Sequence, residues 1–468
     1  MKKNDIFTVT VAGFSASGDG VARIDGQVVF VKGALDGETC RVKILKVGKT
    51  QAYARVEQVL TPSAHRVEPL CPNFGKCGGC ALMHMDYAQE LAFKRDRVLD
   101  ALRRIGGLEP EELTISASPR EYAYRNKCIY SVSRDGKGRA VTGFFRQRSH
   151  DVIPVERCAI ESDVSGRAAG AVRRWMDDCA VPAYDEATGT GIVRHVFCRY
   201  GFASGQAMVV LVSARDRIPE APRLLALLRE SCPEMTSLIL NVNKAVGNTV
   251  LGGSFRTLWG ADHIEDTLCG LTFKLSPRSF YQINHDQAQR LYAKALEYAG
   301  LTGRETVLDL YCGTGTITLC LAQQAKIAIG AEIVPDAIRD AEENARRNGI
   351  ANARFLCADA FAAAAQLDEE GIRPDVIVVD PPRKGLAPEV VEIIARMAPR
   401  RVVYVSCDSA TLARDLKRFA PLGYALRAVE AFDMFPKTAH CEVVCQLTHN
   451  GEKGRDADLQ EALSHDCH

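Results

Sequence analysis

The feature that most restricts the fold of this chain is a regular alternation of short apolar runs and amphipathic segments after about residue 270. The clearest strand-like runs are TVLDLYCG, IAIGAEI, DVIVVDPPR and RVVYVSCD, and helix-period segments lie between them. Strands that alternate with helices form a parallel sheet, and such sheets bind ligands at the carboxyl ends of their strands. We therefore expect residues 271–449 to fold as an α/β domain with a doubly wound, Rossmann-like sheet that ends in two further strands.

The rest of the chain predicts two smaller units and a tail. Residues 1–60 are short strands with period-two alternation, split by glycines, which favours a small antiparallel, OB-like β-barrel. Such a barrel is either a nucleic-acid platform or a structural module, and the pattern alone does not decide. Residues 61–270 hold a cysteine-rich loop, a helix over 86–107 and mixed strands, and predict an α+β middle domain. The polar, aperiodic residues 450–468 are typical of a disordered tail.

Composition is that of a folded protein, with 47% apolar and 25% charged residues and no apolar run of the roughly 18 residues that span a membrane. The start, MKKNDIFTVTV, lacks the apolar stretch of a secretory signal, so we expect a cytoplasmic protein. An odd total of seventeen cysteines argues against a disulfide framework. Several are expected to be small buried apolar residues, namely Cys128, Cys198, Cys320 and Cys445.

One segment has a local excess of positive charge, although the net charge of the chain is only +1. Between Arg120 and Arg148, eight Arg or Lys residues stand against two acids, and aromatic residues lie among them. Cations and aromatic rings together are typical of surfaces that bind single-stranded RNA. We expect the stretch Y-R-N-K at 124–127 to contact RNA, and a solvated basic face is the alternative.

The turn after the first strand of the α/β domain resembles an adenosine-cofactor loop. Gly313 and Gly315 follow that strand and let a ligand approach backbone N–H groups. A dinucleotide fingerprint needs a third glycine where Thr318 stands, which disfavours an NAD site. Glu332 ends the next strand, at the spacing where a carboxylate accepts hydrogen bonds from ribose hydroxyls. Asp359 ends the third strand and would either meet an adenine edge or cap a helix.

Two further strands end in chemically active residues. Asp380 is followed by two prolines, which predict a rigid turn at the ligand-binding edge of the sheet. Cys407 lies between a strand and a helix, whose cap would be Asp408 or Ser409. The positive end of that helix would lower the pKa of the thiol. Position alone, however, favours a structural cysteine over a catalytic one.

Five motifs together resemble the RNA uracil-C5 methyltransferase family, and they occur in order along the whole catalytic half. They are S-F-Y-Q-I-N at 279–284, D-L-Y-C-G-T-G-T at 309–316, D-P-P-R at 380–383, S-C-D-x-A-T at 406–411 and H-x-E at 440–442. The resemblance implies a class I fold that uses S-adenosylmethionine as methyl donor. Its implied donor contacts are Gln282, Tyr311, Thr316, Glu332 and Asp380. Thr316 stands where relatives often have Asn, and Ser409 replaces the usual Pro.

The same resemblance implies that Cys407 is the nucleophile and Glu442 the proton acceptor. Addition of a thiolate to C6 of uracil creates negative charge at C5, which can then take an activated methyl group. A base must afterwards remove the C5 proton so that the thiolate leaves. Asp380 and His440 are alternative bases, and we rank Glu442 first because of the resemblance.

The loop CPNFGKCGGC carries three cysteines, and a distant fourth follows in PVERCAI: Cys71, Cys77, Cys80 and Cys158. Four thiolates suit either a tetrahedral zinc ion or an iron-sulfur cluster, and their spacing does not separate the two. The resemblance implies a 4Fe-4S cluster in the middle domain. It also identifies the amino-terminal barrel as similar to a TRAM domain, an RNA-binding module.

Barrel and cysteine set together resemble the branch of the family that modifies 23S ribosomal RNA, whereas we expect the tRNA branch to share only the middle and catalytic parts. We therefore expect the partner to be 23S rRNA, before or during subunit assembly, and the protein to act as a monomer. An NAD-dependent oxidoreductase and a cluster-based RNA-binding redox sensor are the alternatives. The missing third glycine disfavours the first, and the presence of thiol, base and donor loop disfavours the second.

Overall fold

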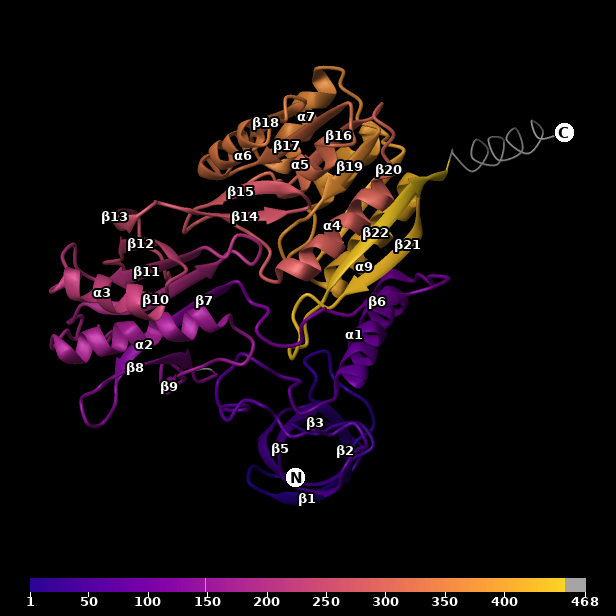
Figure 1. The fold of residues 1–468 in the computed structure, drawn as a ribbon. Helices are drawn as coiled ribbons and strands as arrows, with labels where there is room; N and C mark the ends of the chain where they lie inside the picture. Colours follow the sequence, from indigo (N-terminus) through magenta and orange to yellow (C-terminus); the bar gives the residue numbers. More distant parts are fainter. Residues whose placement is uncertain (148, 451–468) are drawn as a thin grey trace.

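The computed structural model describes residues 1–147 and 149–450. Apart from Asn450, the tail expected to be disordered lies outside the described residues. The amino-terminal unit is a five-stranded barrel, seen as a ring in Figure 1, with strand order β1-β4-β5-β3-β2. Its strands are β1 (Ile6–Thr10), β2 (Gly20–Ile24), β3 (Gln27–Lys32), β4 (Thr39–Val47) and β5 (Gln51–Thr61). The expected antiparallel pairing holds except between β3 and β5, which pair in parallel.

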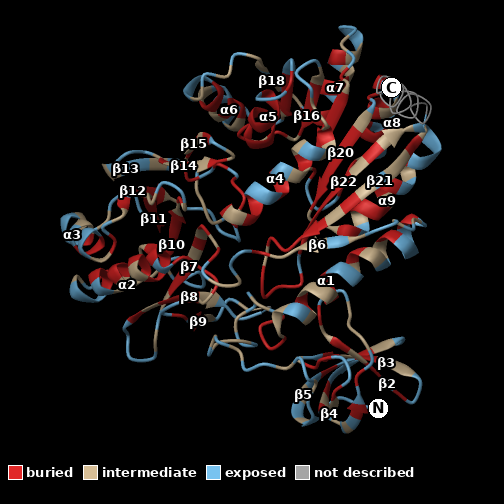
Figure 2. Ribbon diagram, turned by 45° about the vertical axis from the view of Figure 1, so that its right-hand side comes forward, coloured by how far each residue is buried: buried red, intermediate tan, exposed pale blue. Residues whose placement is uncertain are grey.

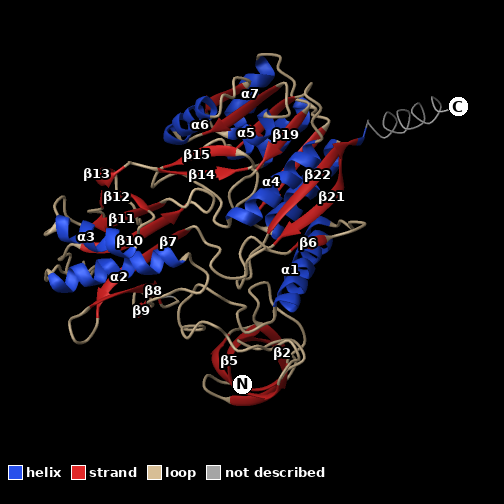
Figure 3. Cartoon of the chain, viewed as in Figure 1, coloured by secondary structure: helices blue, strands red, loops and turns tan. Residues whose placement is uncertain are grey.

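The middle unit is a seven-stranded sheet with order β13-β12-β11-β10-β7-β8-β9, and two helices cover one face of it (Figure 3). The strands are β7 (Lys127–Arg134), β8 (Ala140–Phe145), β9 (Val152–Pro154), β10 (Val193–Tyr200), β11 (Ala207–Ser213), β12 (Met235–Val242) and β13 (Ser254–Gly260). The helices are α2 (Asp163–Asp178) and α3 (Ala221–Ser231). The opposite face is also buried, because Phe197, Met208 and Ile239 pack into a core shared with the catalytic unit.

The catalytic unit is an eight-stranded sheet with order β18-β17-β16-β19-β20-β22-β21-β6. Its strands are β6 (Thr114–Ser116), β16 (Thr306–Leu310), β17 (Ile327–Glu332), β18 (Ala353–Cys357), β19 (Val376–Val379), β20 (Arg401–Ser406), β21 (Tyr424–Phe432) and β22 (Glu442–His449). Its helices are α4 (His285–Ala299), α5 (Thr316–Ala322), α6 (Pro335–Arg347), α7 (Ala360–Glu369), α8 (Pro388–Met397) and α9 (Ser409–Phe419), with a short 3-10 turn at Ala420–Leu422. The strands from β18 to β20 are parallel, and β22 returns antiparallel to β20, as the sequence predicts. A hairpin of β14 (Ile264–Leu268) and β15 (Leu271–Leu275) joins this unit to the middle sheet.

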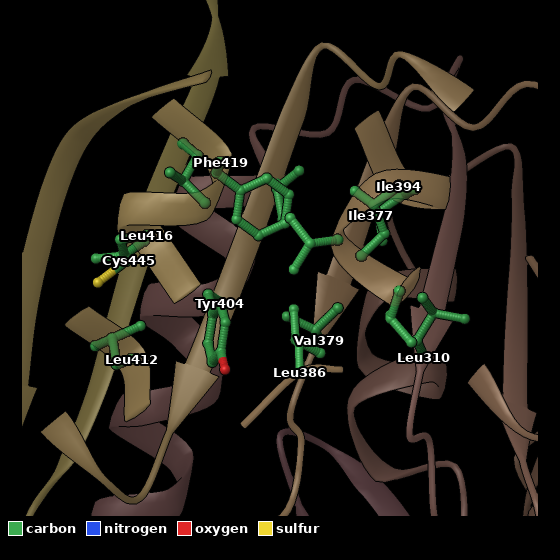
Figure 4. Packing of buried hydrophobic residues seen from close by; sticks show 14 of the residues in the cluster. Leu310, Ile377, Val379, Leu386, Ile394, Tyr404, Leu412, Leu416, Phe419 and Cys445 are labelled. Carbon is green, nitrogen blue, oxygen red and sulfur yellow. The ribbon is translucent and has the colours of Figure 1, made fainter. Parts of the chain in front are cut away.

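Alternate residues of each central strand point to opposite faces of the catalytic sheet, as period-two strands require. Ile377 and Val379 of β19 pack against α7, α8 and α9, whereas Val376 and Val378 pack toward α4 and α5. Figure 4 shows the first of these cores, in which Leu412 of α9 lies on one side of Tyr404 and Val379 of β19 on the other. The central strands β16 and β20 are buried along nearly their whole length (Figure 2). The four cysteines expected in cores are all buried: Cys128, Cys198, Cys320 and Cys445.

Residues 87–116 lie on the catalytic sheet, although the sequence analysis assigned them to the middle domain. Helix α1 (Tyr87–Ala101) continues into a π-helical turn, Leu102–Gly106, and its Val98 and Leu102 are fully buried against the core of α8 and α9. Strand β6 pairs with β21 at the edge of the sheet. The three residues of β6 are too few to show a strand pattern in the sequence, so only their contacts with β21 reveal that they belong to this sheet.

Among the described residues, no helix combines the length and the apolar character that crossing a lipid bilayer requires.

Candidate active site

A cavity of about 810 Å³ lies at the carboxyl ends of β16, β17, β19 and β20. Its lining includes every donor and catalytic residue that the sequence analysis names: Gln282, Tyr311, Thr316, Glu332, Asp380, Cys407 and Glu442. These residues are far apart in sequence, and most of them meet because the parallel strands end at the same edge of the sheet. Gln282 comes from the loop before α4, and Glu442 opens the antiparallel strand β22 at that edge. The sequence motifs therefore converge on one site.

The loop after β16 is shaped by backbone geometry and by Glu332. Tyr311, Gly313 and Gly315 all have positive φ, and a Cβ on Gly315 would come within 3.0 Å of the side chain of Ala341. The carboxylate of Glu332 accepts hydrogen bonds from the N–H groups of Gly313 (3.3 Å) and Val334 (2.9 Å). Glu332 thus holds the glycine loop and the start of α6 together at the cavity.

Thr316 and Asp359 both stand at helix starts beside the cavity. The hydroxyl of Thr316 lies 3.1 Å from that of Tyr292, which is buried on α4. Asp359 accepts hydrogen bonds from the N–H groups of Phe361 and Ala362, both at 3.0 Å. It is therefore the N-cap of α7 as well as part of the cavity lining.

The middle domain fixes the segment that carries Gln282. The side chain of Asn126 donates to the carbonyl of Gln282 at 2.8 Å, and its backbone N–H donates to the carbonyl of Ile283 at 2.9 Å. The buried guanidinium of Arg199 donates to the carbonyl of Ser279 at 2.7 Å. One wall of the cavity is consequently built from two domains.

Cys407 and Glu442 are neighbours across the end of an antiparallel strand pair. Ser406 of β20 pairs with Val443 of β22, so the next residues on the two strands are Cys407 and Glu442. Asp380 follows β19, which pairs with β20 on the other side. A thiol and two carboxyl groups therefore converge at one edge of the sheet.

The carboxyl groups of this edge hold their protons more tightly than free acids do. Burial, aided by the charge of Asp309, raises the pKa of Asp380 to about 7. Burial also raises the pKa of Asp309 to about 7, although the hydroxyl of Thr318 donates to it at 2.6 Å. Burial, followed by the charge of Asp380, raises the pKa of Glu442 well above its ordinary value. Glu442 is thus a strong proton acceptor once ionised.

The expected lowering of the Cys407 pKa is wrong for the protein without substrate. Asp408 caps α9 by accepting from the N–H groups of Ala410 and Thr411, both at 3.0 Å, so the helix does begin at the thiol. Burial outweighs this helix effect, and with the nearby carboxylates of Glu442 and Asp380 it raises the pKa of Cys407 to about 11. The charge of Arg383 lowers the pKa in part.

Several cavity residues were not predicted from the sequence to line this site, although Lys127 was expected to contact RNA. Lys127, Phe280, Arg383 and Phe435 line the cavity, and Phe280 is 60% exposed. Burial, together with the charge of Arg199, lowers the pKa of Lys127 to about 8. Arg383 is part of the D-P-P-R motif, so its presence in the cavity could have been predicted from the sequence.

The structure leaves only part of the stretch Y-R-N-K at 124–127 free to contact RNA, a contact that stays a prediction. Tyr124 and Asn126 are 1% and 2% exposed and bind the protein's own backbone. Arg125 is paired with Glu161 at 3.0 Å and keeps a partly exposed side chain. Lys127 alone of the four lines the cavity.

The four cysteines of the expected cluster come together from two segments. Cys71, Cys80 and Cys158 pack against the small core of Met83, Tyr124 and Ile160. Burial raises the pKa of the Cys80 thiol, and the Cys158, Cys77 and Cys71 thiols raise it further. Burial raises the pKa of Cys158 to about 12. Within residues 1–147 and 149–450, no group of three or more His, Cys, Asp or Glu side chains is spaced to hold a metal ion.

Comparison with known proteins agrees with the motifs and the geometry. Residues 260–450 match the family model of tRNA (uracil-5-)-methyltransferases, and residues 2–56 match that of the TRAM domain. An uncharacterized RNA methyltransferase of Clostridium tetani is 42% identical over 97% of this chain and 98% of its own length. A second, from Clostridium acetobutylicum, is 40% identical over 95% of this chain and 97% of its own length.

Among solved structures, a Pyrococcus abyssi tRNA (uracil-54, C5)-methyltransferase in complex with S-adenosyl-L-homocysteine superimposes with a TM-score of 0.77 at 27% identity. The match covers 94% of this chain and 99% of that one. The unmatched residues of this chain are fewer than the residues of the barrel, so the match includes at least part of the barrel. The expectation that the tRNA branch shares only the middle and catalytic parts is therefore wrong for this enzyme. The chain belongs to the RNA uracil-C5 methyltransferase family, with a class I methyltransferase fold and an amino-terminal TRAM domain.

Proposed function

We propose that this protein transfers a methyl group from S-adenosylmethionine to C5 of a uridine in RNA, with Cys407 as nucleophile and Glu442 as base. The observation that carries the proposal is that one cavity holds the thiol, the buried carboxyl groups and the glycine loop. A donor and a flipped base would meet there, because enzymes that modify a base take it out of the stack.

The methyl donor would bind along the glycine loop. Glu332 would face the ribose hydroxyls, and Gln282, Tyr311, Thr316 and Asp380 would line the rest of the donor site. The Pyrococcus abyssi relative is in complex with S-adenosyl-L-homocysteine, which supports this donor. The cavity sits where the carboxyl ends of the strands place adenosine ligands in such sheets.

The reaction would proceed through a covalent adduct. The Cys407 thiolate attacks C6 of the uracil, and the electron pair of the C5–C6 double bond moves into an enolate with negative charge at C5. That carbon takes the methyl group from the sulfonium of the donor, which leaves as S-adenosylhomocysteine. Glu442 then removes the C5 proton, the double bond forms again, and the thiolate leaves C6. Arg383 favours the thiolate, since its charge lowers the pKa of Cys407.

Large-subunit ribosomal RNA is the substrate we propose, bound by one copy of the protein before or during subunit assembly. The cysteine set, which resembles that of the 23S branch, supports this choice, and the basic segment from Arg120 to Arg148 supports RNA of either kind. The barrel does not favour rRNA, because the match to the Pyrococcus abyssi tRNA enzyme extends into it. Purified unmodified 23S rRNA and unmodified tRNA, each incubated with the enzyme and labelled donor, test it. We expect the rate of 5-methyluridine formation in 23S rRNA to be at least about tenfold higher than in tRNA. Labelling of tRNA alone would overturn the rRNA assignment and leave uridine methylation standing.

A 4Fe-4S cluster on Cys71, Cys77, Cys80 and Cys158 is the second cofactor we propose. Four partly buried thiols from two segments are a donor set of the right chemistry and number, and the other three lie near enough to act on the pKa of Cys80. In the described residues they are not yet spaced to hold a metal ion, so binding of the cluster would have to draw them together. When bound, the cluster would tie the loop at 71–80 to the segment around Cys158 in the middle domain.

Anaerobic purification tests the cluster. We expect about four iron and four acid-labile sulfide atoms per chain, and their loss in Cys80→Ser. Cys179→Ser, which changes a cysteine at the end of α2, is the matched control and should keep the iron. Zinc in place of iron, or iron content that Cys80→Ser leaves unchanged, contradicts the assignment.

A further inference from the structure

The loop between β21 and β22, residues 433–441, determines where the carboxyl group of Glu442 lies. Phe432 and Glu442 pair at the base of this hairpin, so Glu442 is the first residue after the loop. The loop also brings Phe435 and His440 to the cavity wall. It contains no helix or strand of its own. Its position must therefore come from contacts with other parts of the chain.

A buried lysine on α1 makes the strongest of these contacts. The ammonium group of Lys94 is fully buried and donates to Asp433 (2.6 Å), to the carbonyl of Phe435 (3.2 Å) and to Glu90 one turn earlier on α1 (2.6 Å). Tyr87, at the start of the same helix, donates to Asp433 at 2.8 Å. Helix α1 thus holds both the beginning and the middle of the loop.

A second lysine, in the loop itself, closes the network. The backbone N–H of Lys437 donates to Glu90 at 2.6 Å, and its ammonium group donates to Glu121 at 2.6 Å. That ammonium also lies 3.3 Å from Glu90 and over the rings of Tyr87 and Tyr122. Lys437 has a φ of 68°, a conformation that non-glycine residues adopt only when their surroundings hold them. Glu90 therefore bridges the two lysines.

Backbone contacts from the cysteine segment complete the support. The carbonyl of Lys437 accepts from the N–H groups of Ala81 and Leu82, both at 3.0 Å, and these residues follow Cys80 directly. The hydroxyl of Tyr124 donates to the carbonyl of Pro436 at 3.0 Å. The loop is thus held by α1 on one side and by the cysteine segment on the other.

Stability alone is a poor reason for this arrangement. Replacing a buried ion network by apolar side chains of similar volume is often neutral or stabilising, because the network must repay a large desolvation cost. What charged hydrogen bonds add is direction, since each one fixes the geometry of both partners. Here the fixed element is the loop that leads into Glu442.

We propose that Lys94, Glu90 and Lys437 are positioning residues for the removal of the C5 proton. The inference rests on the proposed function and assigns to α1 a part in the last step of that reaction. When Lys94 is replaced, the buried carboxylates of Asp433 and Glu90 lose the ammonium group that they share. Buried charges without a partner are costly, so the loop moves to expose them to water. Cys407 and Asp380 directly follow β20 and β19, and the network does not contact these strands, so addition and methyl transfer should continue.

The test uses full-length Lys94→Met with ordinary uridine RNA and S-adenosylmethionine. We expect kcat to fall more than about tenfold while a methylated RNA–protein adduct, stable in denaturant, accumulates. Hydrogen exchange of the amides at 433–442 should quicken, and exchange in β16 to β20 should not. Lys94→Arg should recover part of the turnover. Arg167→Met, which removes an ion pair with Glu234 in the middle domain, is the control and should change none of these readouts.

Lys437→Met serves as a second variant in case Lys94→Met does not fold, and it should accumulate the same adduct. The inference is wrong if a folded variant turns over within about twofold of the wild type. It is equally wrong if turnover falls without adduct, because the loss then lies before proton removal. Failure of the wild-type protein to form an adduct with 5-fluorouridine RNA would instead refute the proposed function itself.

Discussion

A Cys407→Ala variant is expected to form 5-methyluridine at least about 10⁴-fold more slowly than the wild type, because without the thiol the uracil ring acquires no negative charge at C5. Cys407 follows β20 beside Glu442 and Asp380, so its removal leaves the strands and the glycine loop in place. Tritium transfer from labelled S-adenosylmethionine to RNA measures the loss.

Binding of the methyl donor is the control for this variant. Calorimetry with S-adenosylmethionine should give a Kd within about twofold of the wild-type value, since the loop around Glu332 is unchanged. Turnover above about one per cent of wild type in Cys407→Ala would mean that another group attacks C6.

Glu442→Gln is expected to transfer one methyl group per enzyme and then stop. Glutamine keeps the shape of the side chain but cannot accept the C5 proton, so the thiolate cannot leave C6. The raised pKa of Glu442, caused first by its burial, makes this carboxyl a strong proton acceptor. A denaturing gel should show the enzyme bound to methylated RNA with natural uridine, where the wild type shows free product.

The matched variants for the base are Asp380→Asn and His440→Asn, since both residues share the cavity with Glu442. We expect neither to accumulate the methylated adduct. Normal turnover by Glu442→Gln, together with a stalled adduct in one of the other two, would move the base role to that residue.

The sequence predicted the catalytic sheet because most of its parallel strands are predominantly apolar runs that end in a polar motif. In such a fold the ligand site lies at the strand ends. The positions of D-L-Y-C-G-T-G-T, D-P-P-R and S-C-D at strand ends were therefore enough to predict that Tyr311, Asp380 and Cys407 line one cavity. The sequence left Asp408 and Ser409 as candidate caps of α9, and in the structure Asp408 is the N-cap.

What the sequence could not predict depends on contacts between distant segments. Lys94 looks like an ordinary charged residue of an amphipathic helix, and its partner Asp433 lies 339 positions later. Burial of Cys407 by surrounding elements, and not its local sequence, raises the pKa of its thiol. Tyr124 and Asn126 lie in a basic, aromatic stretch that suggests an RNA surface, yet the fold uses both to hold other loops.

The proposed function depends on a covalent bond between Cys407 and uracil, and mass spectrometry of the enzyme can detect this bond directly. The wild-type protein is incubated with S-adenosylmethionine and an RNA substrate that carries 5-fluorouridine, then digested with nuclease and protease. Fluorine cannot leave C5 as a cation, so elimination fails and the adduct persists. We expect a methylated fluorouridine nucleotide on the peptide that contains Cys407. Modification of a different cysteine among the seventeen, or no modified peptide at all, would contradict it.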